Sequence, residues 1–268
     1  MKLEKEKLES MTNELVEWIR TMMKDSGGSK AIVGISGGKD SSVVASLCVK
    51  AIGKENVFGV LMPDGIQRDI DYAHEICSYL DISHEVVPIH PMTDAFLTTL
   101  ESIKGDFIPE ISNQTRINLP PRVRMTLLYA LSQSIEGSRV INTSNLSEDW
   151  VGYATIYGDT AGAFSPLAML TTDEVIQVGR YLGVPEKFLA KPPEDGLTGK
   201  TDEDVLGFSY DTLNRYIREG NIENEATKKI IDKMHKNSRF KFVPIPMFKA
   251  NLPIKAEDIA DIYNEEKE

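Results

Sequence analysis

The sequence of 268 residues has few cysteines, fewer basic than acidic residues and no long apolar run. Its two cysteines, Cys48 and Cys77, each fall in an apolar pattern of helical spacing, so we expect buried thiols in a reducing cytoplasm rather than a disulfide or a catalytic pair. The 41 acidic residues outnumber the 30 basic ones, and the net charge of −11 disfavours nucleic acid or an anionic membrane as a partner. No signal peptide, membrane span or repeat is recognisable.

One stretch combines an apolar strand, Ala31–Ile35, with a glycine turn and the start of a helix near Asp40. Gly37 and Gly38 allow backbone conformations that other residues avoid and let a ligand approach closely. Backbone N–H groups and the positive end of a helix would then point at one spot, which suits phosphate. The stretch is not a P-loop, because Lys39 is followed by Asp40 rather than Ser or Thr, and its glycines lack the dinucleotide-binding spacing.

Expected strands and helices alternate along the chain. After the first strand, apolar runs predict strands at Val57–Met62, Glu85–Ile89 and Val140–Asn142. Strands separated by helices usually pair in parallel through right-handed crossovers. We therefore predict an α/β fold, a doubly wound parallel sheet with flanking helices, in a single domain over 1–268. Its parts would be an N-terminal helix (1–25), a core (about 26–190) and a C-terminal helical part with a tail (about 191–268).

The segments between the strands show apolar residues at spacings of three and four, which predict helices. These helices are expected at Leu3–Lys24, from Asp40 to about Gly53, Asp69–Leu80, from Pro91 to about Ile103, from Pro120 onward, Thr172–Leu182, Asp202–Arg218 and Asn224–Lys236. We expect irregular structure at 104–118, long loops at 143–165 and 191–200, and an extended tail at 240–252 before a short last helix. Long loops beside a buried sheet usually have a function.

The glycine turn resembles a known nucleotide loop. Ser36-Gly-Gly-Lys-Asp-Ser41 is similar to the pyrophosphate loop (PP-loop) of ATP pyrophosphatases, which implies cleavage between the α and β phosphates of ATP. The alternative is an ordinary strand-turn-helix whose glycines serve geometry. Six matching residues between a buried strand and a helix favour the PP-loop.

An ordered set of later motifs resembles the ammonia-dependent NAD synthetases. These motifs are Arg122-Val-Arg-Met125, Thr143-Ser-Asn-Leu-Ser-Glu148, Gly152-Tyr153 with Tyr157-Gly-Asp159, Thr201-Asp-Glu203 with Leu206-Gly207, and His235-Lys236. The resemblance implies an adenine nucleotide alpha-hydrolase-like fold and a homodimer. It also implies an amide synthesis: ATP would adenylate the nicotinate carboxylate of deamido-NAD, and ammonia would displace AMP to give NAD.

The same resemblance assigns roles to individual residues. Adenylation needs backbone donors and a divalent cation to hold the phosphates, and two carboxylates with phosphate oxygens suit Mg²⁺. The implied metal ligands, which are also the expected catalytic residues, are Asp40 and Glu148. Contacts to ATP are implied for Gly34, Ile35, Ser36, Gly37, Gly38, Lys39, Asp40, Ser41 and Thr143. Contacts to the substrate are implied for Arg122, Asp159, His235 and Lys236.

Each of these residues also has a plain structural interpretation. Asp40 could be an acid at a helix start, Glu148 a loop charge and Arg122 a surface residue of an amphipathic helix. Asp159 could close an Asx turn, and the pair His235-Lys236 could interact with the end of a helix. The residues alone leave these alternatives open.

Four positions depart from the family pattern. Ile156 and Thr172 stand where lysines are common, Ala163 where an acid is common, and Glu194 where a small hydroxyl residue is common. The change at Ile156 removes a cation that could pair with the nicotinate carboxylate or the phosphates. We expect that the adenylation chemistry could survive these changes while recognition of the acceptor shifts.

Three other functions are compatible with parts of the sequence. A PP-loop ligase for a different small carboxylate would explain Ile156 and Ala163. A tRNA-thiolating PP-loop enzyme is disfavoured by the negative charge and the two separated cysteines. A non-catalytic nucleotide-binding module would bind ATP without turnover. The chain has no residues left for a glutaminase domain, so free ammonia is the expected nitrogen donor.

Overall fold

The computed structural model describes residues 2–103, 110–191, 202–222, 224–250, 252 and 253. Within them lies a sheet of four strands in the order β3-β2-β1-β4, with every neighbouring pair parallel. The strands are β1 (Lys30–Gly34), β2 (Val57–Leu61), β3 (Ser83–Val86) and β4 (Ser138–Val140). The predicted parallel α/β sheet is confirmed.

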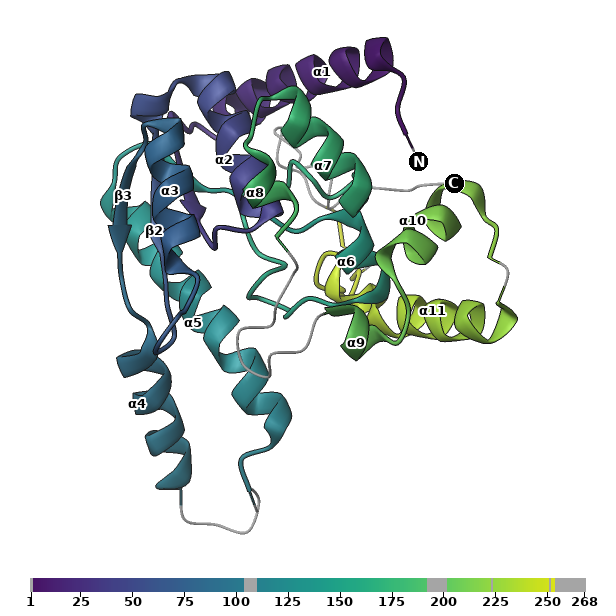
Figure 1. Ribbon diagram of the computed structural model, residues 1–268. Coiled ribbons are helices and arrows are strands. Elements are labelled where there is room, and N and C mark those ends of the chain that lie inside the picture. Colours follow the sequence, from purple (N-terminus) through teal and green to yellow (C-terminus); the bar gives the residue numbers. More distant parts are fainter. Residues whose placement is uncertain (1, 104–109, 192–201, 223, 251, 254–268) are drawn as a thin grey trace.

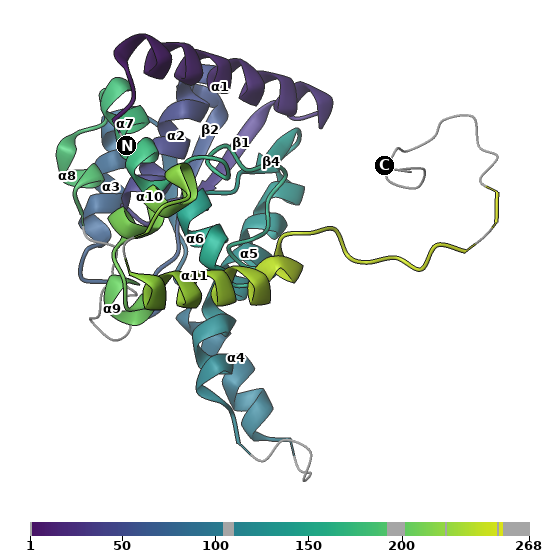
Figure 2. The same cartoon turned by 90° about the vertical axis from the view of Figure 1, so that its right-hand side faces the viewer.

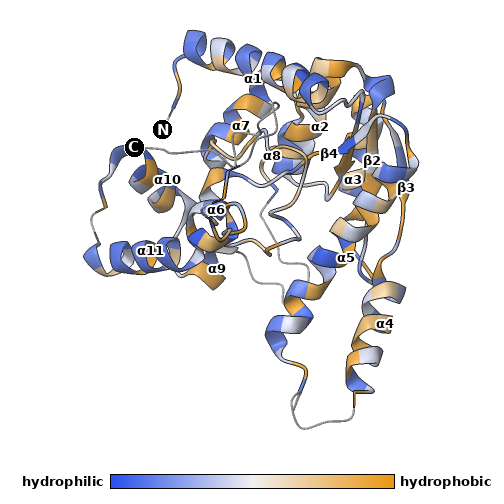
Figure 3. Ribbon diagram, turned by 180° about the vertical axis from the view of Figure 1, so that it is seen from behind, coloured by the Kyte–Doolittle hydropathy of each residue, from blue (hydrophilic) through white to orange (hydrophobic). Residues whose placement is uncertain are grey.

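Helices cover both faces of this sheet (Figure 1). One face packs against α1 (Lys5–Asp25), α2 (Lys39–Ile52), α3 (Ile70–Leu80), α7 (Thr172–Tyr181) and α8 (Glu186–Leu189). The other packs against α4 (His90–Glu101) and α5 (Asn113–Ser134). Side chains of a strand alternate between faces, so Ala31 and Val33 join the first core and Ile32 the second. Figure 3 shows apolar residues on β2 and α2, and many polar turns on α1 and α11.

A third apolar cluster lies beside the sheet and joins the C-terminal helices to a short helix after β4. Its elements are α6 (Leu146–Val151), α9 (Asp202–Leu206), α10 (Tyr210–Glu219) and α11 (Glu225–Ser238). Short 3₁₀ turns occur at η1 (Lys54–Asn56) and η2 (Arg239–Lys241). After η2 the chain leaves the body as an extended segment (Figure 2).

The start of α5 differs from the prediction. The helix begins at Asn113, well before Pro120, so the expectation of irregular structure up to residue 118 is wrong for its described last part. The Ser112 side chain accepts a hydrogen bond from the backbone N–H of Thr115, and this cap starts the helix. Pro120 and Pro121 therefore lie inside the helix rather than in its first turn.

Other boundaries also shift. The strand expected at Glu85–Ile89 lies at Ser83–Val86. Beyond it, the Val87 N–H still donates to the carbonyl of Leu61, the last residue of β2, and the Ile89 N–H donates to the carbonyl of Pro63. The strand expected at Val140–Asn142 lies at Ser138–Val140, and Ile141 forms an isolated bridge with Phe164. The segment 143–165, expected to be a loop, contains the short helix α6. The Asn145 side chain caps the start of this helix.

The helix expected at Asp202–Arg218 is two helices, α9 and α10. Gly207 adopts a positive φ of 79° between them, and the Ser209 side chain caps the second helix. The loop expected at 191–200 falls almost wholly, and the short last helix wholly, outside the described residues.

Cys48 and Cys77 are free thiols buried in the core, as predicted. Burial raises the pKa of each thiol to about 12, so neither is a reactive thiolate at neutral pH.

Among the helices of the described segments, none combines the length and the apolar character needed to cross a lipid bilayer.

Candidate active site

The PP-loop joins the C-terminal end of β1 to the first turn of α2. Gly37 has a φ of 79°, and a Cβ added there would lie 2.7 Å from the backbone nitrogen of Ala73 in α3. A side chain at this position would therefore be strained and would also clash with backbone. Gly38 is the N-cap of α2 and offers no capping side chain, which leaves N–H groups of the first helical turn available to an anion.

Serine hydroxyl groups fix the shape of this loop. The Ser36 and Ser41 Oγ atoms lie 3.1 Å apart, and the Gly38 N–H donates to Ser36 Oγ over 3.3 Å. Ser42 Oγ donates to the Gly38 carbonyl over 2.7 Å. The loop is thus held by its own side chains before any nucleotide binds.

Asp40 and Glu148 meet at the edge of the sheet. Asn145, the N-cap of α6, accepts from the N–H groups of Ser147 and Glu148, and its Nδ2 donates to Asp40 Oδ1 over 3.0 Å. The Lys39 ammonium donates to Asp40 Oδ2 over 2.9 Å and lies 4.0 Å from Glu148 Oε1. The structure therefore brings both predicted metal ligands to the PP-loop. Asn145 belongs to the motif Thr143–Glu148, but the sequence alone does not distinguish it from its neighbours.

These residues fit a divalent cation. A Lys39 ammonium within 4.0 Å of both carboxylates marks a place where positive charge is already accommodated. Carboxylate oxygens suit Mg²⁺, which usually takes only one or two protein carboxylates and completes its shell with water and phosphate. The described residues include no group of three His, Cys, Asp or Glu that could hold a metal alone.

The segment after β4 is tied to the sheet by Asn142. Its Nδ2 donates to the carbonyls of Asp159 and Ala161, while its Oδ1 accepts from the Ser144 N–H and from Ser165 Oγ. Thr143, a predicted ATP contact, follows Asn142 directly and is half-buried at the same edge as the PP-loop. Asn142 carries this organisation, which the sequence does not reveal because its apolar run predicts a strand through Asn142.

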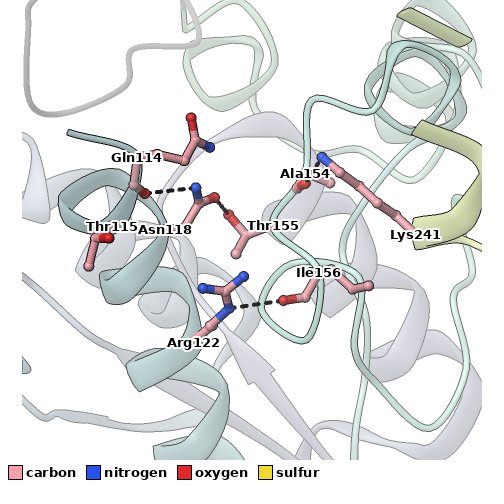
Figure 4. Close-up of a pocket in the computed structure, with 8 residues that line it drawn as sticks. All are labelled: Gln114, Thr115, Asn118, Arg122, Ala154, Thr155, Ile156 and Lys241. Carbon is pink, nitrogen blue, oxygen red and sulfur yellow. Dashed lines mark hydrogen bonds between the residues drawn. The ribbon is translucent and has the colours of Figure 1, made fainter. Parts of the chain in front are cut away.

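A pocket lies between the start of α5 and the loop after α6 (Figure 4). It has a volume of about 270 Å³ and is lined by Gln114, Thr115, Asn118, Arg122, Ala154, Thr155, Ile156 and Lys241. The Arg122 Nε donates to the Ile156 carbonyl over 3.1 Å. Lys241 Nζ donates to the carbonyls of Gly152 and Ala154 over 2.8 Å each. Two cations thus enter one polar pocket.

The charges of this pocket influence one another. Burial lowers the pKa of Lys241, nearby Arg122 lowers it further, and Asp159 opposes both effects. The Asp159 Oδ2 accepts the Thr155 N–H over 2.9 Å, so this carboxylate closes its own loop. The bond reaches back four residues, whereas an Asx turn bonds two residues ahead, so the structure shows a loop-closing role but not the expected Asx turn. The negative charge of Asp159 is also close enough to raise the pKa of Lys241.

The predicted pair His235-Lys236 does not line the pocket. The His235 ring packs on the Trp150 ring at 4.0 Å between centroids and pairs through Nδ1 with the Trp150 carbonyl, while Lys236 is exposed. Whether either residue reaches a substrate stays a prediction. Lys241 occupies the pocket instead. The signal for it was weak: one charge in the otherwise apolar run Phe240-Lys-Phe-Val243.

Asp149, beside Glu148, is a second feature that the sequence did not reveal. Its Oδ1 is buried and has no hydrogen-bond partner among the described residues. Burial raises the pKa of this carboxyl to about 7, with a further contribution from Asp159 and opposition from Arg239. The carboxyl therefore adds little negative charge to the site below neutral pH.

The departures from the family pattern have structural consequences. Ile156 contributes its carbonyl, not a charge, to the Arg122 contact. Thr172 is buried in a network where its Oγ1 accepts from Asn214 and its N–H donates to Ser147 Oγ. Ala163 is exposed, and its N–H bonds to the Val140 carbonyl. Glu194 lies outside the described residues.

Comparison with known proteins agrees with this architecture. The family model described as NAD synthase matches residues 11–253. An NH(3)-dependent NAD(+) synthetase from Pyrococcus horikoshii is 37% identical over 206 residues, covering 76% of this chain and 77% of the relative.

Two solved structures are also similar. The NMN synthetase from Francisella tularensis has a TM-score of 0.81 at 30% identity, with coverage of 91% of this chain and 99% of that one. The NH3-dependent NAD synthetase from Campylobacter jejuni, in complex with the nitrate ion, has a TM-score of 0.72 at 29% identity, with coverage of 90% and 98%. With its PP-loop intact and its family match spanning most of its length, the chain belongs to the NAD synthase family, the ATP-dependent ligases that use ammonia to form NAD.

Proposed function

We propose that the sheet edge formed by the PP-loop and α6 binds ATP with Mg²⁺ and uses it to adenylate the nicotinate carboxylate of deamido-NAD. The observation that carries the proposal is the meeting of Asp40, Glu148 and Asn145 at the PP-loop, where the start of α2 has no side-chain cap. Asp40 and Glu148 would hold the metal. Bound there, Mg²⁺ would neutralise the charge that grows on pyrophosphate.

The protein's own contribution is positioning and electrostatics. A carboxylate is a poor acyl donor, so it attacks the α-phosphorus, expels pyrophosphate and gains AMP as a leaving group. The N–H groups around Gly37 and Gly38 would hold the departing phosphates in line, in a loop that the serines have already shaped. Ammonia then attacks the adenylated carbonyl, AMP leaves, and an amide remains.

The pocket of Arg122 and Lys241 is the proposed site for anionic groups of the acceptor. A guanidinium suits a bidentate contact with carboxylate or phosphate, and the lysine adds a second charge. Both side chains are at present engaged by backbone carbonyls, which a stronger anionic partner would replace. Lys241 would thus provide the cation that Ile156 lacks.

One observation favours a second acceptor, nicotinate mononucleotide. The TM-score is 0.81 with the NMN synthetase against 0.72 with the Campylobacter NAD synthetase, at nearly equal identity. The altered positions Ile156 and Ala163 lie in the loop that borders the acceptor pocket. A shorter acceptor with the same carboxylate would undergo the same chemistry and give NMN.

A product assay separates the two acceptors. Mg-ATP and ammonium are supplied with either deamido-NAD or nicotinate mononucleotide, and AMP, pyrophosphate and the amide are followed together. Equal amounts of AMP, pyrophosphate and NAD establish the dinucleotide as the substrate. Formation of NMN at a much higher kcat/KM moves the assignment to the mononucleotide. No AMP with either acceptor contradicts the ligase assignment and points to a nucleotide-binding module.

We also propose that the chain acts as a homodimer. The outer side of α5 carries an apolar hollow lined by Met125, Thr126, Tyr129, Ala130, Gln133, Tyr157 and Ala161. The hollow shares α5 with Arg122 and its loop with Ile156. A second copy seated there would cover apolar surface next to the acceptor pocket.

A further inference from the structure

A lysine side chain occupies the place where the proposed metal would bind. Lys39 is the first residue of α2, and only 8% of its side chain is exposed. Its ammonium lies between Asp40 Oδ2, at 2.9 Å, and Glu148 Oε1, at 4.0 Å, and 5.9 Å from the centre of the Tyr210 ring. Two half-buried carboxylates facing each other would repel, and the ammonium neutralises them.

An ammonium and a divalent cation cannot share this position. Like charges a few ångströms apart repel strongly where water screens them poorly. Metal binding to Asp40 and Glu148 must therefore displace the Lys39 head group. The lysine stem is flexible and Lys39 begins α2, so a displaced ammonium would stay near the uncapped start of the helix, where an anion would bind.

We propose that Lys39 is an exchangeable cation of the active site. In the nucleotide-free protein its ammonium neutralises Asp40 and Glu148. When the metal binds these carboxylates, the ammonium is displaced and pairs with the triphosphate of ATP. This inference rests on the proposed metal site. It gives Lys39 two effects of opposite sign, because the lysine opposes binding of the metal alone and favours binding of the nucleotide once the metal is in place.

The test replaces the charge and measures both kinds of binding. Mn²⁺ binding without nucleotide is measured by electron paramagnetic resonance for the wild type, Lys39→Met, Asp40→Asn and a control, Lys50→Met. Lys50 lies on the same helix, is exposed and is near the Tyr181 ring. Binding of a non-hydrolysable ATP analogue is then measured by calorimetry at Mg²⁺ concentrations that saturate each variant.

Lys39→Met is expected to bind Mn²⁺ roughly tenfold more tightly than the wild type, because the competing charge is gone. It is expected to bind the analogue roughly tenfold more weakly, because a charge-assisted contact is lost. Lys50→Met should match the wild type in both measurements, and Asp40→Asn should lose Mn²⁺ binding. Lys39→Gln, which keeps a polar side chain, repeats the test if the methionine variant does not fold.

Two results would overturn the inference in distinguishable ways. Equal Mn²⁺ affinity in the wild type and Lys39→Met, with binding lost in Asp40→Asn, leaves the metal site standing and removes the exchange role of Lys39. Absence of any Mn²⁺ binding that depends on Asp40, in Lys39→Met as well, removes both. A purely structural lysine would change the two affinities in the same direction or change neither.

Discussion

Lys241 brings a positive charge to a pocket whose other cation, Arg122, already meets the Ile156 carbonyl. If this ammonium binds the acceptor, Lys241→Met should raise the KM for the nicotinate substrate by roughly tenfold, the scale of one lost charge-assisted contact, and leave the KM for ATP nearly unchanged. Steady-state kinetics with each substrate varied in turn measures the effect.

The exposed Lys236 provides the matched comparison for this variant. Lys236→Met removes the same charge from the end of α11, outside the pocket. If Lys236→Met raises the acceptor KM and Lys241→Met does not, the pocket assignment is wrong and the pair His235-Lys236 becomes the better site.

Single residues were predictable from sequence where their function depends on their neighbours in the chain. Gly37 and Asp40 belong to a contiguous loop, and the structure places both as a strand-turn-helix requires. Lys241 reaches its pocket through the packing of α11 on α6, and Asn142 acts through contacts to a later loop. No local pattern records such contacts between distant segments.

At the scale of elements, the PP-loop depends on how closely α3 approaches it. Gly37→Ala should destabilise the fold by about 2 kcal/mol or more, because it combines a left-handed φ with a backbone clash. Gly38→Ala is the matched control: its φ is −87°, and its added Cβ meets only Ser36 Oγ at 3.4 Å. Chemical denaturation compares the two. Equal stability of both variants would show that the loop does not require the left-handed conformation.

The ion pair between Glu174 and Arg218 joins α7 to α10 through two contacts of 2.7 and 2.6 Å. Burial alone would raise the pKa of Glu174, but the hydrogen bonds from Arg218 and the Thr171 N–H outweigh it and lower the pKa. Ionised Glu174 therefore stabilises the fold at neutral pH. This contribution is lost as pH falls through the lowered pKa, below the ordinary value of about 4.3.

Glu174→Gln should accordingly be less stable than the wild type by about 1 to 3 kcal/mol at pH 7, and the difference should shrink toward pH 3. Urea denaturation across that range measures it. Glu186→Gln, which breaks an exposed pair with Arg180, should have a smaller effect because water screens exposed pairs. A difference for Glu174→Gln that does not vary with pH would contradict the linkage.

Elements were predictable where apolar periodicity was continuous and less so where a side chain set the boundary. The helices α1, α2 and α3 follow their apolar patterns closely. The start of α5 depends on the Ser112 cap, and Pro120-Pro121 is a plausible but incorrect start signal. The short helix α6 depends on the Asn145 cap, inside a polar segment without periodicity.

At the scale of the whole molecule, the outer side of α5 is the surface that we propose for a second copy. The hollow beside Tyr129 and Tyr157 has a volume of about 530 Å³, and these two side chains are 38% and 60% exposed. Aromatic side chains that border an apolar hollow are typical of the buried centre of an interface. The surface also adjoins the pocket of Arg122, so dimer formation and acceptor binding would be linked.

If the proposed dimer forms, Tyr129→Glu is expected to convert it to a monomer, because the new charge would be buried without a partner in the interface. Light scattering after size-exclusion chromatography measures the mass. Ile230→Glu, at an apolar side chain 47% exposed on α11, should leave the dimer intact. A wild type that is monomeric at micromolar concentration would contradict the dimer, and a Tyr129→Glu variant that stays dimeric would place the interface elsewhere. If dimer formation and acceptor binding are linked, the monomer should have a higher KM for the acceptor than the wild type has. Its KM for ATP should change less.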